Sequence, residues 1–299
     1  MRALTVTTPD GRQLEVLDGG DPDGFPWLQH GGTPSAAVPF PVFDTAARDA
    51  GLRLITYSRP GYGASSPLSA PGQVVDDAAD SATILDALGA NEFVTLGWSG
   101  GGPRALACAA VLASRCLSAA TLAGVGPADA PDLDFHQGMG PENLEEFAAA
   151  AQGPEVYGEY LAEQGAQLAT VTAADIAASL GDLVTPVDAD ALTGDFADWL
   201  AATFRHAFAQ GVVGWRDDGL AELNPWGFDL PAITVPVSVW QGRHDSMVPY
   251  AHAVWLIDHI PGARAHLFED EGHISVVMKI DEILTDLKDL AGLPASDRA

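Results

Sequence analysis

Residues 93–104 read FVTLGWSGGGPR and contain the pattern G-x-S-x-G centred on Ser99. The apolar run 93–96 ends at a glycine, as a buried strand does, and the alanine-rich residues 104–113 favour a helix. This order of strand, tight turn and helix predicts a nucleophile elbow, with Ser99 exposed at the apex of a strained turn. The start of the helix also aims the Gly100 N–H at the place where an oxyanion would develop.

The pentapeptide alone is also compatible with an ordinary glycine-rich turn, because the chain has 32 glycines. A catalytic serine needs a base to take its proton and an acid to orient that base. The interpretation of Ser99 therefore depends on residues elsewhere in the chain.

The composition predicts a globular protein without a nucleic-acid or membrane partner. The 299 residues are 47% hydrophobic and 18% charged, which argues against global disorder and leaves room for one large domain with an insertion, or for two domains. The formal net charge of −27 disfavours binding to nucleic acids or anionic membranes, since both need a basic surface. Its simplest interpretation is a solvated surface that keeps the protein soluble.

The sequence shows neither a disulfide framework nor a targeting segment. Cys108 and Cys116 are the only cysteines, and Met1 leads directly into an alternating run without a long apolar segment. The most apolar window, residues 106–125, is broken by polar residues and is more typical of a helix followed by a strand than of a membrane span. We therefore expect a cytoplasmic protein.

Short apolar runs alternate with helical patterns, which predicts an α/β fold with a mostly parallel sheet covered by helices on both faces. Strands are expected at residues 3–8, 13–17, 27–29, 53–57, 93–96, 117–122, 235–240 and 263–268, and helices at 74–88, 104–113, 250–260 and 274–290. A helical stretch, residues 129–229, interrupts this rhythm and holds nineteen acidic residues against two arginines. We expect a core domain of residues 1–126 and 231–299 and an inserted helical cap of residues 127–230.

Candidates for the base and the acid follow the last two predicted strands. His273 comes after a strand and a short turn, whereas the other downstream histidines fall in the insertion, inside predicted elements, or directly beside the candidate acid. Asp245 follows the strand at 235–240, although an aspartate before a helix can also serve as its N-cap. Asp129, after an earlier strand, is the rival acid.

Five motifs occur together in the order known from one family. They are His30-Gly31-Gly32, the run from Tyr57 to Ser65 (YSRPGYGAS), Gly97 to Gly101 (GWSGG), Gly242 to Pro249 (GRHDSMVP) and Glu271-Gly272-His273. In these motifs the chain resembles the α/β hydrolases with a cap, over residues 1 to about 125 and 231 to 291. The insertion matches only as a generic helical cap.

The resemblance implies a role for each matched residue. Ser99 is then the nucleophile, His273 the base and Asp245 the orienting acid, while the N–H groups of Gly32 and Gly100 form the oxyanion hole. We also expect His30, Trp98 and Met247 to contact the substrate. A serine at the elbow disfavours the dehalogenase and epoxide-hydrolase chemistry of relatives that carry aspartate there.

These assignments predict a serine hydrolase that cleaves a carboxylic ester, or a related activated carbonyl, through an acyl-enzyme. Two alternatives stay open: an aminopeptidase similar to proline iminopeptidases, which share a glycine pair after the histidine, and a slow small-molecule receptor on the same scaffold. No cofactor and no metal are expected, because phosphate-loop, dinucleotide and zinc motifs are absent. The oligomeric state is left open.

Large apolar residues of the cap are expected to roof the pocket or to form the core of the cap: Phe135, Trp199, Phe204, Trp215 and Trp226.

Overall fold

The computed structural model describes residues 1–295 and contains one eight-stranded sheet in the order β1-β2-β4-β3-β5-β6-β7-β8. β1 and β2 pair antiparallel, β2 also pairs antiparallel with β4, and all further neighbours are parallel. The strands are β1 (Arg2–Thr7), β2 (Gln13–Gly20), β3 (Phe25–His30), β4 (Leu52–Tyr57), β5 (Phe93–Trp98), β6 (Cys116–Leu122), β7 (Val237–Gly242) and β8 (Arg264–Phe268). The predicted mostly parallel sheet is confirmed.

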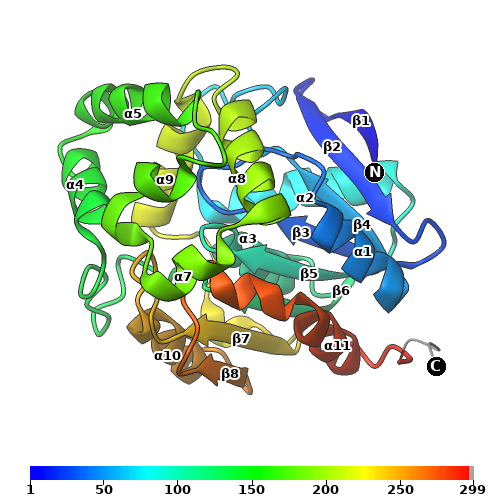
Figure 1. Ribbon diagram of the computed structural model, residues 1–299. Coiled ribbons are helices and arrows are strands. Elements are labelled where there is room, and N and C mark those ends of the chain that lie inside the picture. Colours follow the sequence, from blue (N-terminus) through cyan, green and yellow to red (C-terminus); the bar gives the residue numbers. More distant parts are fainter. Residues whose placement is uncertain (296–299) are drawn as a thin grey trace.

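Helices cover the sheet, and the chain between β6 and β7 consists of helices joined by loops, as Figure 1 shows. The α-helices are α1 (Pro41–Ala50), α2 (Asp77–Ala87), α3 (Gly101–Val111), α4 (Pro141–Ala150), α5 (Pro154–Leu168), α6 (Ile176–Ser179), α7 (Pro186–Ala191), α8 (Gly194–Ala207), α9 (Val213–Leu223), α10 (Tyr250–His259) and α11 (Ile280–Leu290). Short 3₁₀ turns lie at η1 (Val74–Asp76), η2 (Gly181–Leu183), η3 (Leu230–Ala232) and η4 (Ser275–Lys279).

Side chains of successive strand residues enter the cores on opposite faces of the sheet. Trp27 packs in the cluster that contains residues of α1 and α11, whereas its neighbour Leu28 packs in the cluster that contains residues of α2, α3 and α10. The same alternation separates Leu54 from Ile55 on β4. Because side chains alternate across a strand, two buried faces produce the continuous apolar runs seen in the sequence.

Two predicted helices are interrupted in the structure. The helix expected at 74–88 starts as η1, where Gln73 and Asp76 form a capping box, and continues as α2. The helix expected at 274–290 is split into η4 and α11. Helix α1 was not predicted; it begins with a proline at its first turn and ends at Gly51, whose left-handed φ of 67° closes it.

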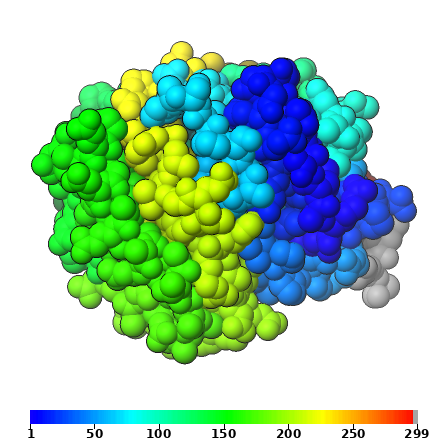
Figure 2. Space-filling model, turned by 90° about the horizontal axis from the view of Figure 1, so that it is seen from above, coloured from blue at the N-terminus to red at the C-terminus, as the bar shows by residue number. Residues whose placement is uncertain are grey.

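The insertion lies over the carboxyl ends of the parallel strands. In register, His30 pairs with Gly97, Trp98 with Leu122, and Leu122 with Trp240, so these strands end together. Figure 2, viewed from above, shows the green to yellow residues of the insertion gathered on one side of the molecule, with light-blue residues between them and the dark-blue N-terminal strands. In open α/β sheets this edge is where ligands bind.

Candidate active site

Ser99 lies at a sharp turn between β5 and α3. Its φ of 56° is left-handed, a strained conformation for a residue with a side chain. Two hydrogen bonds hold the turn: the Ser99 N–H donates to the Leu122 carbonyl at 2.9 Å, and the Gly102 N–H donates to the Ser99 carbonyl at 2.8 Å. The Ser99 side chain is partly exposed, although its neighbours on both sides are buried.

Two glycines allow the turn to be this tight. A Cβ on Gly97 would collide with the carbonyl of Gly101, and a Cβ on Gly101 would collide with the carbonyl of His30. Helix α3 can therefore approach β3 and β5 only because both positions lack a side chain. The close approach of α3 to these strands explains why the pattern G-x-S-x-G needs glycine at positions 97 and 101.

Asp245 and His273 form a hydrogen-bonded pair at the ends of neighbouring strands. His273 Nδ1 lies 2.8 Å from Asp245 Oδ2, and both side chains are buried. Gln241 Nε2 also donates to Oδ2 at 2.8 Å, while Oδ1 accepts the N–H groups of Met247 and Val248 at 2.8 and 2.7 Å. The carboxylate is thus fixed by four donors. The N-cap of the following helix is Pro249, so Asp245 is not a helix cap.

The surroundings of His273 favour its charged form. Burial alone would lower the pKa of His273, but the charge of Asp245, its hydrogen bond and the charge of Asp188 outweigh burial and hold this pKa above the ordinary value. Since a carboxylate can only accept, Nδ1 carries the proton and the neutral ring keeps Nε2 free to act as a base. The Trp98 indole N–H donates to the His273 carbonyl at 3.2 Å and places the indole beside the imidazole.

Asp188 was not predicted, and it holds the His273 loop from the insertion. Its side chain is completely buried and accepts the N–H groups of His273, Ile274 and Ser275 at 3.1, 2.8 and 2.9 Å. These bonds satisfy backbone donors at the start of η4. The only local signal in the sequence is Thr185-Pro186 before Asp188, which predicts the start of helix α7. It does not indicate that Asp188 contacts His273, which lies 85 residues further along the chain.

The two glycines expected to form the oxyanion hole flank Ser99. A Cβ on Gly32 would lie 3.3 Å from Ser99 Cβ, so the Gly32 backbone is directly beside the nucleophile. Gly32 and Gly100 both line the cavity above Ser99. Within residues 1–295, no acceptor is hydrogen-bonded to the N–H of either glycine. Both donors are therefore free to bind an oxyanion.

A cavity of about 180 Å³ joins Ser99, His273 and the two glycines beneath the insertion. Trp98 and Met247, two of the expected substrate contacts, lie in its wall. Ser99 and His273 share this cavity, but no hydrogen bond joins them within the described residues. Such bonds are often long in free enzymes and tighten when substrate binds.

Of the large cap residues, Phe204 and Trp215 line the cavity. Trp199 instead stacks on Phe40, with ring centroids 4.2 Å apart. Phe135 and Trp226 belong to the core cluster that includes α3 and α10.

The expectation that His30 contacts substrate is wrong for this geometry. His30 is 1% exposed and does not line the cavity; its Nε2 lies 3.8 Å from Cys108 Sγ, and its ring meets the edge of Tyr57. Burial, with the charges of Arg59 and Arg104, lowers the pKa of His30 to about 3, so the ring is neutral. His30 is a core residue beneath the site.

The rival acid, Asp129, is exposed on the loop after β6 and lines a separate surface hollow with Trp226 and Trp255. It forms no hydrogen bond with His273, whose Nδ1 is bonded to Asp245. The geometry favours Asp245.

Three glutamates that were not predicted also face the cavity: Glu142, Glu146 and Glu222. Burial, together with the charge of Glu222 and against the hydrogen bond from Tyr157, raises the pKa of Glu146 to about 7. Burial also raises the pKa of Glu222, against the charge of Arg104. The cavity wall includes no lysine or arginine. Arg104 lies behind this wall and pairs with Glu222 at 2.6 Å, so Glu142 and Glu146 are the carboxyls that make it an acidic pocket.

The sequence profile of the α/β hydrolase fold family matches residues 28–279. The chain belongs to this family. Among curated relatives, this α/β hydrolase is similar to a non-heme chloroperoxidase of Streptomyces lividans, with 28% identity over 258 residues that cover 83% of this chain and 84% of that protein. It is 24% identical over 291 residues to a non-heme haloperoxidase of Rhodococcus erythropolis, covering 94% and 97% of the two chains.

A solved structure supports the fold independently. An esterase from Rhodococcus sp. superimposes with a TM-score of 0.70 at 20% identity, over 97% of this chain and all of that one. The predicted family and fold class are thus confirmed. Residues 1–295 contain no group of three or more His, Cys, Asp or Glu side chains arranged for a metal ion, and none of their helices has the length and apolar content needed to cross a bilayer.

Proposed function

We propose that this α/β hydrolase cleaves carboxylic esters through an acyl-enzyme on Ser99. The observation that carries the proposal is the His273–Asp245 pair, with every Asp245 oxygen bonded, at the same cavity as a serine held at a left-handed turn. A serine, a base and an orienting carboxylate are the parts that nucleophilic acyl transfer needs.

The proposed reaction uses these groups in two half-reactions. His273 Nε2 takes the proton of Ser99 as Oγ attacks the carbonyl carbon; the ester C–O bond then breaks, and the alcohol leaves with that proton. Water next attacks the acyl-enzyme with His273 as base, and Ser99 is released with the acid product. The free N–H groups of Gly32 and Gly100 stabilise the oxyanion of both tetrahedral intermediates.

A panel of aryl and alkyl esters with fluorophosphonate labelling tests this proposal. We expect covalent labelling of Ser99 and hydrolysis of at least part of the panel. In a time course with an activated ester in excess, product release should continue linearly over many enzyme equivalents, because the same residues serve acylation and deacylation. Release that stops near one equivalent, with a change in protease sensitivity of the insertion, would instead identify a receptor.

The similarity to two haloperoxidases favours a second candidate activity on the same acyl-enzyme. If hydrogen peroxide replaces water in the second half-reaction, the acyl group leaves as a peracid, which oxidises bromide to hypobromous acid and becomes the carboxylate. Bromination of a reporter diketone should then need acetate, peroxide, bromide and Ser99 together. Bromination that continues without a carboxylic acid would contradict this route.

The acidic pocket predicts discrimination by substrate charge. Because Glu142 and Glu146 line the cavity without a lysine or arginine, and Arg104 offsets the charge of Glu222, esters with a cationic acyl group should be hydrolysed with higher kcat/KM than matched anionic esters. We expect about tenfold or more between acyl groups of equal size that end in an ammonium or a carboxylate, which corresponds to ~1.4 kcal/mol. Including an N-terminal prolyl arylamide tests aminopeptidase activity in the same series.

The discrimination should also depend on pH. Since the pKa of Glu146 is raised to about 7, this carboxyl is neutral below that pH and charged above it. The preference for cationic esters should therefore grow as pH rises through that value, and Glu146→Gln should weaken this dependence. Equal kcat/KM for the two charged esters at low salt would show that the glutamates lie away from the bound acyl group.

A further inference from the structure

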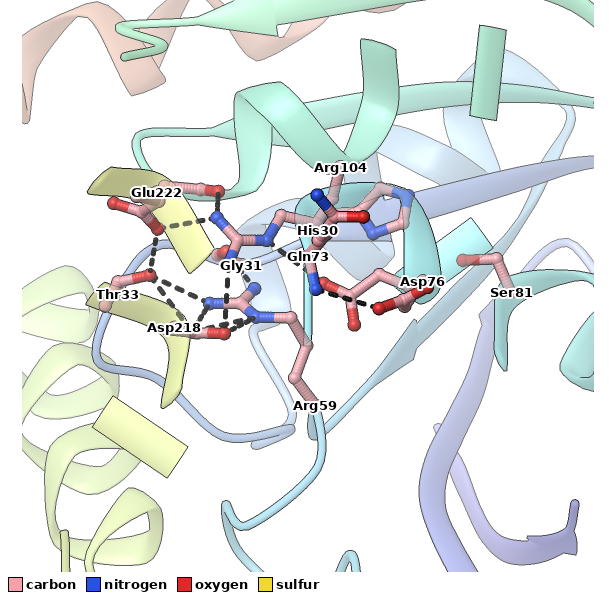
Figure 3. Close-up of polar contacts among 12 residues, drawn as sticks. His30, Gly31, Thr33, Arg59, Gln73, Asp76, Ser81, Arg104, Asp218 and Glu222 are labelled. Atoms are coloured by element: carbon pink, nitrogen blue, oxygen red, sulfur yellow. Dashed lines mark hydrogen bonds and ion pairs between the residues drawn. The ribbon is translucent and has the colours of Figure 1, made fainter. Parts of the chain in front are cut away.

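A buried ionic cluster lies behind the proposed oxyanion hole. Figure 3 shows two arginines in it, Arg59 after β4 and Arg104 on α3, facing carboxylates of the insertion on helix α9, Asp218 and Glu222. Arg59 is 3% exposed, and Arg104 is completely buried. Thr33, which follows the glycine pair, is hydrogen-bonded to Arg59 and to both carboxylates.

The Arg59 guanidinium donates both to the Asp218 carboxylate and to the carbonyls of the glycine pair. Its Nε and one terminal nitrogen donate to Asp218 at 3.0 and 2.6 Å. The other terminal nitrogen, Nη1, donates to the Gly31 carbonyl at 2.6 Å. The terminal nitrogen that bonds to Asp218, Nη2, also donates to the Gly32 carbonyl at 2.9 Å. A planar fork of five donors suits such a set of acceptors.

The bond to Gly31 acts directly on the expected oxyanion donor. The Gly31 carbonyl and the Gly32 N–H belong to one planar trans peptide, so they point in opposite directions. A cation on the carbonyl side therefore fixes the direction of the N–H, and it polarises that N–H toward an anion in the cavity. Arg104 differs in this respect, because its bond to the Gly100 carbonyl acts on the peptide that holds the Gly101 N–H.

The charges of the cluster keep Arg59 in place. Burial would raise the pKa of Asp218, but the charges of Arg59 and Arg104 and the hydrogen bonds from Arg59 and Tyr62 keep it below its ordinary value. Asp218 therefore stays ionised and retains Arg59 by a bond that joins helix α9 to the loop after β4.

We propose that Arg59, held by Asp218, is a positioning residue that orients and polarises the Gly31–Gly32 peptide for oxyanion binding. The proposal rests on the proposed function at Ser99. A tether between the insertion and the core would need only the contact of Arg59 with Asp218. The two additional bonds to the glycine carbonyls point to the oxyanion hole.

The variant Arg59→Lys tests the proposal while keeping a positive charge beside Asp218. A single ammonium cannot reproduce the planar fork that binds Asp218 and both carbonyls. We expect kcat for an aryl ester to fall about tenfold to 100-fold with KM within about twofold, because removal of a whole oxyanion donor costs on the order of 10²–10³. Binding of an aryl trifluoromethyl ketone, whose serine adduct carries an oxyanion, should weaken in parallel, whereas binding of the matched alcohol should not change.

Arg12→Lys is the matched control. Arg12 also makes a two-pronged bond, to Asp80 at 2.7 and 2.8 Å, but it lies on the β1–β2 turn and does not line the cavity. Its kcat and KM should stay within about twofold of wild type. Unchanged kcat in a folded Arg59→Lys protein, or equal losses for the ketone and the alcohol, would overturn the positioning role.

Two further measurements decide the remaining cases. If Arg59→Lys does not fold, the charge-matched double variant Arg59→Met/Asp218→Leu takes its place with the same readouts and the same expected pattern.

The Gly32 amide gives a readout that does not depend on hydrolysis: its ¹⁵N shift and its hydrogen exchange should change in the Arg59 variant and not in Arg12→Lys. A wild-type protein that cleaves no ester would refute the proposed function, whereas an unchanged Gly32 amide would refute the role of Arg59.

Discussion

Replacing Ser99 by alanine is expected to abolish ester hydrolysis and to leave the fold intact. The hydroxyl forms none of the hydrogen bonds that hold the turn, since these come from the backbone of Ser99 and Gly102. Alanine removes the nucleophile without adding volume beside Gly32. Loss of a triad serine typically costs on the order of 10³ to 10⁶ in turnover. The measurement is kcat on the best ester, together with the melting temperature.

The matched control for this change is Ser35→Ala. Ser35 also lines the cavity, and its hydroxyl donates to the Gly32 carbonyl at 2.7 Å, a carbonyl that keeps its hydrogen bond from Arg59 in the variant. Ser35→Ala should therefore retain far more activity than Ser99→Ala. Ester hydrolysis at the wild-type rate by purified Ser99→Ala protein would refute the nucleophile assignment, and with it the proposed mechanism.

The sequence allowed a good prediction of the sheet and of the turn at Ser99 because both depend on local patterns. A strand followed by G-x-S-x-G and an alanine-rich helix is readable within twelve residues, and the structure contains that turn with a left-handed φ at Ser99. The positions of Asp245 and His273 follow from the rule that parallel strands end at one edge. Their contact at 2.8 Å is a finding of the structure, while their catalytic roles stay predictions.

Two features could not be predicted because their partners are distant in sequence. Asp188 is bonded to His273 across 85 residues, and Asp218 is bonded to Arg59 across 159. Both lie in an acidic insertion, in which nothing local distinguishes these carboxylates from solvated ones. The wrong expectation for His30 has another cause: the last four residues of β3 are all buried, so the pattern does not show which side chain faces the cavity.

Changing Asp245 to asparagine is expected to lower kcat/KM by roughly 10⁴, because the carboxylate is the group that fixes the tautomer of His273. An asparagine can keep its oxygen toward the N–H groups of Met247 and Val248, but its amide NH₂ then faces two donors, Gln241 Nε2 and His273 Nδ1. The imidazole avoids this conflict by moving its proton to Nε2, where it can no longer take the proton of Ser99.

The pH profile distinguishes this loss from a simple change in ionisation. In wild type, kcat/KM should rise as pH passes through the raised pKa of His273, because the neutral ring is the base. Without the charge of Asp245 this pKa falls, so the rise should move to lower pH while its plateau stays low. Raising the pH should not restore activity to the variant, because the neutral His273 ring still carries its proton on Nε2 and cannot act as the base.

Asp129→Asn is the control, because Asp129 is exposed and forms no hydrogen bond with His273. It should keep wild-type kcat/KM within about twofold, as surface substitutions away from a site usually do. If Asp129→Asn proves the crippling change and Asp245→Asn is mild, the orienting acid follows β6 in the working enzyme. The observed His273–Asp245 pair would then be a resting arrangement, which substrate binding must replace before Ser99 can be activated.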